Sequence, residues 1–249
     1  MCGEDGFEKR LIKKNKPNRM SYNQYGNSFQ RTTPVVLNLI IANVVVFIAQ
    51  YLFGGIESKV TDLFALHHYK SDEFRVHQII THMFMHGGFT HLLFNMFGLW
   101  MFGTTIERIW GPKRFFIFYL ACGIGAAIAQ MGSYAFSYYD IDNSTLPLEQ
   151  IIQYQNVLRV NATVGASGAI MGILAAFGYL FPNTEMMIIP IPIPIKAKWA
   201  ILGIIAIDLF SGVAGRAGDN IAHFAHLGGA ITGFLIVLIQ NKTNKKTFY

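Results

Sequence analysis

Six apolar runs dominate the chain and restrict what it can fold into. They lie at residues 35–53, 89–102, 115–131, 164–181, 197–213 and 221–240, and the run at 89–102 is the shortest. A helix of about 20 apolar residues spans the hydrocarbon core of a bilayer. We therefore predict an all-α, polytopic membrane protein, a bundle of six transmembrane helices in the lipid bilayer.

Charge is scarce in this chain, which excludes several other classes of protein. Only 14% of the 249 residues are charged and 52% are hydrophobic, whereas a soluble domain has about 25% charged residues. The net charge of +6 is too thinly spread to indicate a nucleic-acid partner. Disorder is excluded because the chain has abundant apolar residues to bury.

The basic residues predict the orientation of the six helices. With both termini in the cytoplasm, fifteen of the twenty lysines and arginines fall on the inner side, as the positive-inside rule requires. Residues 1–34 are then a basic cytoplasmic tail, 35–240 the six-span core and 241–249 a short basic cytoplasmic tail. The inner loops, and the lack of a cleavable signal peptide, favour a prokaryotic plasma (inner) membrane.

The connections between the runs differ in character. We expect residues 132–163 to form a long polar loop, and the prolines at 190, 192 and 194 to form an extended connector, because proline disrupts a helix interior. The mixed segment 54–80 is too polar to span, and we expect its tandem histidines, His67 and His68, to be exposed loop residues.

Three polar clusters interrupt the apolar runs, and polar groups inside a bilayer are candidates for function. The clusters are Thr81 to Asn95 (with His82, His86 and His91), Gly165-Ala-Ser167-Gly168, and Ala222 to Gly233 (with His223 and His226). The runs that carry them all enter from the outer side in the predicted topology. At 1.5 Å per residue, His91, Ser167 and His226 lie within roughly 10 Å of the outer surface.

The spacing of small residues indicates how these clusters could meet. Glycines and alanines recur every four residues after Ser167 and around His226, and such stripes let two membrane helices approach closely. Ser167 could then act as a nucleophile with His226 as its general base. His91 and Asn95, four residues apart on one helical face, would donate hydrogen bonds to a developing oxyanion together with the backbone N–H of Ser167.

These motifs, G-x-S-G beside A-H-x-x-G-x-x-x-G and H-x-x-x-H-x-x-x-x-H-x-x-x-N, resemble those of the rhomboid intramembrane serine proteases. The resemblance implies a Ser167–His226 dyad without an acid, an oxyanion hole from His91 and Asn95, no cofactor and no metal. It implies cleavage of membrane-protein substrates at a transmembrane helix. It also makes Glu107 and Arg108 a structural element that ties the second span to its neighbours.

The chain departs from the rhomboid pattern at two places. Met171 stands where many rhomboids carry a tyrosine that stacks on the catalytic histidine, and a thioether can pack against an imidazole. His77-Gln78 aligns with the family's Trp-Arg pair in the first outer loop.

Other polar residues have simpler interpretations. We expect His82, His86 and His223 to be packing or hydrogen-bonding residues. Asp208, near the outer end of the fifth run, could face water, face a substrate entry gap, or be solvated at the membrane interface.

Two rival functions fit part of the sequence. The spacings His82-x-x-x-His86 and His223-x-x-His226 are compatible with a histidine-ligated membrane metalloenzyme or metal transporter, but that hypothesis leaves the G-A-S-G motif unexplained. A catalytically inactive rhomboid-like protein that binds membrane clients is disfavoured, because the serine, the histidine and both oxyanion donors are present.

Overall fold

The structure, a computed structural model, describes residues 32–55, 58–187, 193–214 and 222–243, and most of these are helical. The helices are α3 (Pro34–Leu52), α4 (Lys59–Phe64), α5 (Gln78–Thr81), α6 (Phe89–Gly98), α7 (Thr104–Trp110), α8 (Pro112–Asp142), α9 (Leu148–Val160), α10 (Ser167–Leu180), α11 (Ala197–Ala214) and α12 (His223–Thr243). A 3-10 turn, η1 (His82–Phe84), precedes α6, and a π-helical segment, η2 (Leu99–Gly103), joins α6 to α7. Predicted tail residues 1–31 and 244–249 lie outside the described residues.

Two short antiparallel ribbons accompany the helices. Strand β1 (Leu66–His67) pairs with β2 (Ala162–Thr163), and β3 (Glu185–Met187) pairs with β4 (Pro194–Lys196). The first ribbon joins the loop before α5 to the segment that leads into α10. The second contains the last proline of the predicted extended connector, whose residues 190–192 lie outside the described residues.

Among the described residues, three helices are long and apolar enough to cross a membrane: Pro34–Leu52, Pro112–Asp142 and His223–Asn241. Helix α10 is apolar but shorter. The second predicted span corresponds to α6 and η2, which continue without a break into α7. The described chain is thus mostly helical, as predicted, while the number of six spans stays a prediction.

The predicted polar loop at 132–163 is wrong, because most of it is helical. Helix α8 runs on to Asp142, and α9 follows after a short turn. Tyr134 and Tyr138, one helical turn apart, are buried, and the Tyr134 hydroxyl hydrogen-bonds Thr163 Oγ1 at 2.8 Å. These side chains give α8 an inward face beyond its apolar run, so the helix continues where mean hydropathy falls.

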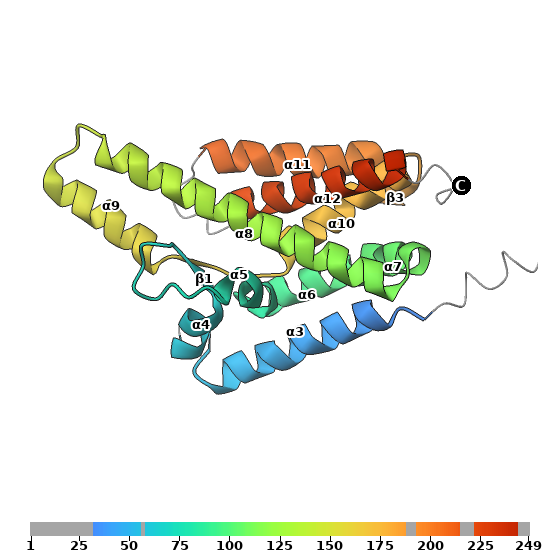
Figure 1. Ribbon diagram of the computed structural model, residues 1–249, viewed down its shortest axis with the longest axis horizontal. Coiled ribbons are helices and arrows are strands. Elements are labelled where there is room, and N and C mark those ends of the chain that lie inside the picture. Colours follow the sequence, from blue (N-terminus) through green and yellow to red (C-terminus); the bar gives the residue numbers. More distant parts are fainter. Residues whose placement is uncertain (1–31, 56–57, 188–192, 215–221, 244–249) are drawn as a thin grey trace, which may run out of the picture. The chain divides into compact units, whose positions relative to one another are not determined.

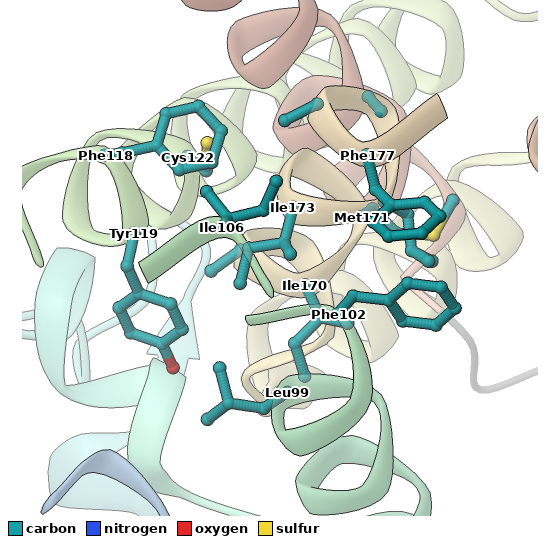
Figure 2. Close-up of a cluster of buried hydrophobic side chains, with 14 of the residues drawn as sticks. Leu99, Phe102, Ile106, Phe118, Tyr119, Cys122, Ile170, Met171, Ile173 and Phe177 are labelled. Atoms are coloured by element: carbon teal, nitrogen blue, oxygen red, sulfur yellow. The ribbon is translucent and has the colours of Figure 1, made fainter. Parts of the chain in front are cut away.

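Helix α10 is the central element of the core. Its residues are buried almost throughout, and it packs side by side with α8 and α12 (Figure 1). Figure 2 shows Ile170, Met171, Ile173 and Phe177 of α10 among buried side chains from α8, η2 and α7. The residue that opens α10 is therefore held by packing on several sides.

Glu107 of α7 ties the start of the first long helix to the core. Its carboxylate, 1% exposed, accepts hydrogen bonds from the backbone N–H groups of Val35 (2.9 Å) and Val36 (2.8 Å) at the first turn of α3. These N–H groups have no partner within their own helix, and a negative charge is favourable at a helix N-terminus. The acidic residue thus makes the tie that the resemblance implied.

The expectation that His67 and His68 are exposed is wrong. Their exposed fractions are 2% and 0%. His68 stacks on Tyr138 of α8, with ring centroids 4.6 Å apart, and His67 lies in β1. The tyrosines of the extended α8 cover this loop, so a polar dipeptide is buried by residues distant in the sequence.

Gln78 organises the same loop. It is fully buried, and its side-chain amide donates to the carbonyl oxygens of Glu73 (2.8 Å) and Asp62 (3.1 Å) while its Oε1 accepts from the N–H of Arg75 (3.1 Å). Gln78 therefore holds several turns of backbone together through its side chain.

Candidate active site

Ser167 opens α10, directly after a sharp turn of the backbone. Gly165 has φ = +124°, a conformation that favours glycine. The N–H of Gly165 donates to the carbonyl oxygen of His82 at 2.9 Å, which fastens this turn to the loop before α6. Ser167 Oγ then lies 2.7 Å from Nε2 of His226.

The two helices that carry this pair are in backbone contact. A methyl group on Gly229 would collide with the carbonyl oxygen of Gly168, and one on Gly233 would collide with that of Gly172. A methyl group on Gly172 would lie 2.9 Å from the carbonyl oxygen of Gly229. The small-residue stripes thus allow the close approach predicted from their spacing, which places Ser167 within reach of His226.

Helix α8 holds the start of α12. Gln130 is buried, and its Oε1 accepts from the backbone N–H of Ala225 at 3.2 Å. This N–H lies in the first turn of α12, where no carbonyl of the same helix is available. The bond fixes the helix end next to His226.

Asp208 of α11 contacts the imidazoles of α12. His226 Nδ1 lies 3.0 Å from Asp208 Oδ2, and His223 Nδ1 lies 2.5 Å from Asp208 Oδ1. The three side chains are 14% (Asp208), 18% (His226) and 10% (His223) exposed. None of the interpretations of Asp208 drawn from the sequence included this contact with the two histidines.

His91 lies against the turn before Ser167. The methyl group of an alanine at position 165 would lie 2.8 Å from His91 Nε2 and 3.6 Å from Ser167 Oγ. The ring is held by the N–H of Gly87, which donates to His91 Nδ1 at 3.2 Å. His91 and Ser167 therefore border the same small space above Gly165.

Asn95 sits one turn further along α6. Its side chain is 5% exposed, and its amide donates to the carbonyl oxygen of His91 at 2.8 Å. One N–H of the amide is bonded within its own helix, and the second N–H of the same nitrogen is left for another acceptor.

The other histidines near the site make hydrogen bonds, as expected. His82 Nδ1 contacts the carbonyl oxygen of Gln78 at 2.8 Å, and His86 Nδ1 that of Phe84 at 3.3 Å. The side-chain amide of Gln50 on α3 makes two hydrogen bonds to the backbone of His86: it donates to the carbonyl oxygen (3.0 Å) and accepts from the N–H (3.2 Å). These two hydrogen bonds fix the loop that leads into α6.

Met171, at the position of the family's tyrosine, is 6% exposed and packs in the core beside Phe177 (Figure 2). Within the described ranges, no group of three or more His, Cys, Asp or Glu side chains is placed to hold a metal ion.

Comparison with known proteins gives a family. The family model of the Rhomboid domain matches residues 73–242. Rhomboid protease AarA of Providencia stuartii is 30% identical over 225 residues, which cover 84% of this chain and 74% of the relative. Rhomboid protease GluP of Bacillus subtilis (strain 168) is 32% identical over 157 residues, 63% of this chain and 24% of the relative.

An organellar relative is similar to the same degree. RHOMBOID-like protein 12, mitochondrial, of Arabidopsis thaliana is 33% identical over 196 residues, or 79% of this chain. The chain spans 55% of the length of that relative.

Proposed function

Because the chain belongs to the rhomboid family, we propose that it is an intramembrane serine endopeptidase that cleaves membrane-protein substrates in or beside a transmembrane helix. The observation that carries this proposal is the 2.7 Å contact between Ser167 Oγ and His226 Nε2. A hydroxyl within hydrogen-bond reach of an imidazole nitrogen is the arrangement that activates a serine nucleophile.

The proposed reaction has two halves. Ser167 Oγ attacks the scissile carbonyl carbon while its proton passes to His226 Nε2. The C–N bond then breaks, and the same proton passes to the leaving amine nitrogen, which leaves an acyl-enzyme. Water, deprotonated by His226, attacks the ester. The Oγ–C bond breaks, the proton held by His226 passes to Ser167 Oγ, and the product departs as a carboxylic acid that gives its proton to bulk water.

The oxyanion of each tetrahedral intermediate needs donors. The backbone N–H of Ser167 points out of the first turn of α10, and His91 borders the same space. We assign the third donor to Asn95, whose amide nitrogen carries a second N–H besides the one bonded to the carbonyl oxygen of His91. Preorganised donors of this kind are among the largest contributions to catalysis of acyl transfer.

The topology follows from the same proposal. Six segments would cross the bilayer: the three longer helices, α6 with η2, α10 and α11. Both termini would lie on the cytoplasmic side of a prokaryotic plasma membrane. Ser167 would then open toward the outer side, from which hydrolytic water enters. The substrate class is a single-span protein whose helix unwinds locally, because helical hydrogen bonds otherwise occupy its backbone carbonyls.

A fluorophosphonate probe tests the nucleophile. The full-length protein in detergent should be labelled, Ser167→Ala should not, and Ser133→Ala, on α8, should be labelled like wild type. A substrate in proteoliposomes should give a cleavage product with wild type and none with Ser167→Ala or His226→Ala. Labelling that persists in Ser167→Ala would reject the assignment, and substrate binding without product would match an inactive client-binding protein instead.

A further inference from the structure

Asp208 is the single acidic residue of α11 (Ala197–Ala214), and its carboxylate lies between two imidazoles of α12. A carboxylate on an apolar helix is unfavourable unless its oxygens find hydrogen-bond donors. Here each oxygen has an imidazole nitrogen within hydrogen-bond distance: Oδ2 lies against His226 and Oδ1 lies against His223. Asp208 therefore contacts His226, the imidazole that in turn contacts Ser167.

The hydrogen bonds determine which nitrogen of His226 carries a proton. An ionised carboxylate can only accept hydrogen bonds, so the Nδ1 that faces Asp208 must be protonated. A neutral imidazole then has its lone pair on Nε2, the nitrogen that lies 2.7 Å from Ser167 Oγ. Only this tautomer can take the serine proton.

We propose that Asp208 is a positioning residue for the Ser167–His226 pair. Its carboxylate fixes the ring orientation and the tautomer of His226, and it offsets the positive charge that the ring gains when it accepts the serine proton. The inference rests on the proposed protease function, and it departs from the acid-free dyad that the resemblance to rhomboids implies.

His223 acts on the carboxylate from the other side. It lies three residues before His226, so the two rings project from the same face of α12. Because each ring holds one oxygen, the carboxylate plane cannot rotate freely about the Cβ–Cγ bond. His223 therefore serves as the second anchor of Asp208.

Steady-state kinetics of the full-length protein in proteoliposomes test the inference. Asp208→Asn should lower kcat at least about 100-fold, because the asparagine amide can donate to Nδ1 and favour the wrong tautomer. KM should change less than about threefold, since substrate binding is untouched. Asp208→Glu should recover part of kcat, and Asp140→Asn, at an exposed site on α8, should match wild type.

The outcomes separate the inference from the proposed function. If wild type neither cleaves substrate nor reacts with fluorophosphonate, the protease function fails and the inference falls with it. If wild type cleaves and Asp208→Asn keeps a wild-type kcat, only the inference fails. A role confined to joining α11 to α12 would lower the melting temperature of Asp208→Asn while the folded fraction kept its kcat, and this too would overturn it.

A spectroscopic measurement does not depend on turnover or on the folding of an Asp208 variant. The sample is the Ser167→Ala variant with ¹⁵N-labelled histidine, studied by NMR. The resonances of His226 are those that disappear when His226→Gln is added to this variant. The inference expects the neutral ring to carry its proton on Nδ1 and none on Nε2. A ring protonated on Nε2 alone would overturn it.

Discussion

Gly165 shows how one residue sets the geometry beside Ser167. Its positive φ turns the chain into α10, and its missing side chain leaves room for the ring of His91. The same residue thus meets a backbone requirement and a packing requirement, and no other amino acid satisfies both.

We predict that Gly165→Ala lowers the cleavage rate by about 100-fold, because a displacement near 1 Å in an active site has an effect of this size. The new methyl group would sit 2.8 Å from His91 Nε2 on a strained backbone. Substrate cleavage in proteoliposomes measures the effect. Gly132→Ala, where a methyl group meets no atom within 4 Å, is the matched control, and equal rates for the two variants would contradict the prediction.

Asn95→Ala tests the proposed oxyanion donor. We expect weak residual cleavage, with a loss of about 2.7–4 kcal/mol of transition-state stabilisation as for other oxyanion donors. The loss should appear in kcat, because the donor acts on charge that develops only in the transition state. Since Asn95 is bonded to its own helix in the structure, a wild-type kcat would mean that this bond is its whole role.

At the scale of elements, the contact between α10 and α12 depends on the absence of side chains. Gly168, Gly172 and Gly229 bring the two backbones together, and this contact carries Ser167 to His226. Side-chain volume at these positions therefore affects stability and the site at once.

Gly229→Ala should destabilise the protein by about 2 kcal/mol or more, within or above the usual range for overpacking, because its methyl group collides with backbone rather than with a flexible side chain. Thermal unfolding in detergent measures this. Gly203→Ala on α11 adds the same methyl group to open space and should leave the melting temperature unchanged or slightly raised. Equal melting temperatures for the two variants would refute the backbone contact.

Glu107→Gln tests the tie between α7 and α3. The variant keeps an acceptor near Val35 and Val36 but loses the charge that favours the helix N-terminus, so we expect unfolding to become easier by about 1 kcal/mol. Thermal unfolding is again the measurement. Glu185→Gln, at an exposed position of β3, should have no effect, and an unchanged Glu107→Gln would mean that the charge contributes nothing.

At the scale of the whole molecule, helix length and charge together bear on the topology. The 31 residues of α8 rise about 46 Å, more than the roughly 30 Å of hydrocarbon in a bilayer. The apolar part of α8 comes first, so its last turns and α9 would project beyond the membrane on the side opposite the basic residues at its start.

Cysteine accessibility tests this arrangement. In a protein without native cysteines (Cys2→Ser, Cys122→Ala), Ser144→Cys should react with a membrane-impermeant maleimide in intact cells. Lys113→Cys, at the other end of α8, should react only after lysis. The reverse pattern would invert the proposed topology, and labelling of both sites from outside would exclude α8 as a spanning helix.

The sequence by itself determined the apolar runs, the helical class and the small-residue stripes, because hydropathy and residue spacing are properties of one segment. The motifs also pointed to Ser167, His226, His91 and Asn95, whose catalytic roles stay predictions.

Only the tertiary structure decided which groups meet across elements. Asp208 was one acid in an apolar run until α11 packed on α12 and gave its oxygens two imidazole donors. His68 was a polar loop residue until Tyr138 of the extended α8 covered it. In both cases the environment of a polar side chain is set by residues far away in the chain, and no local pattern encodes that burial or those partners.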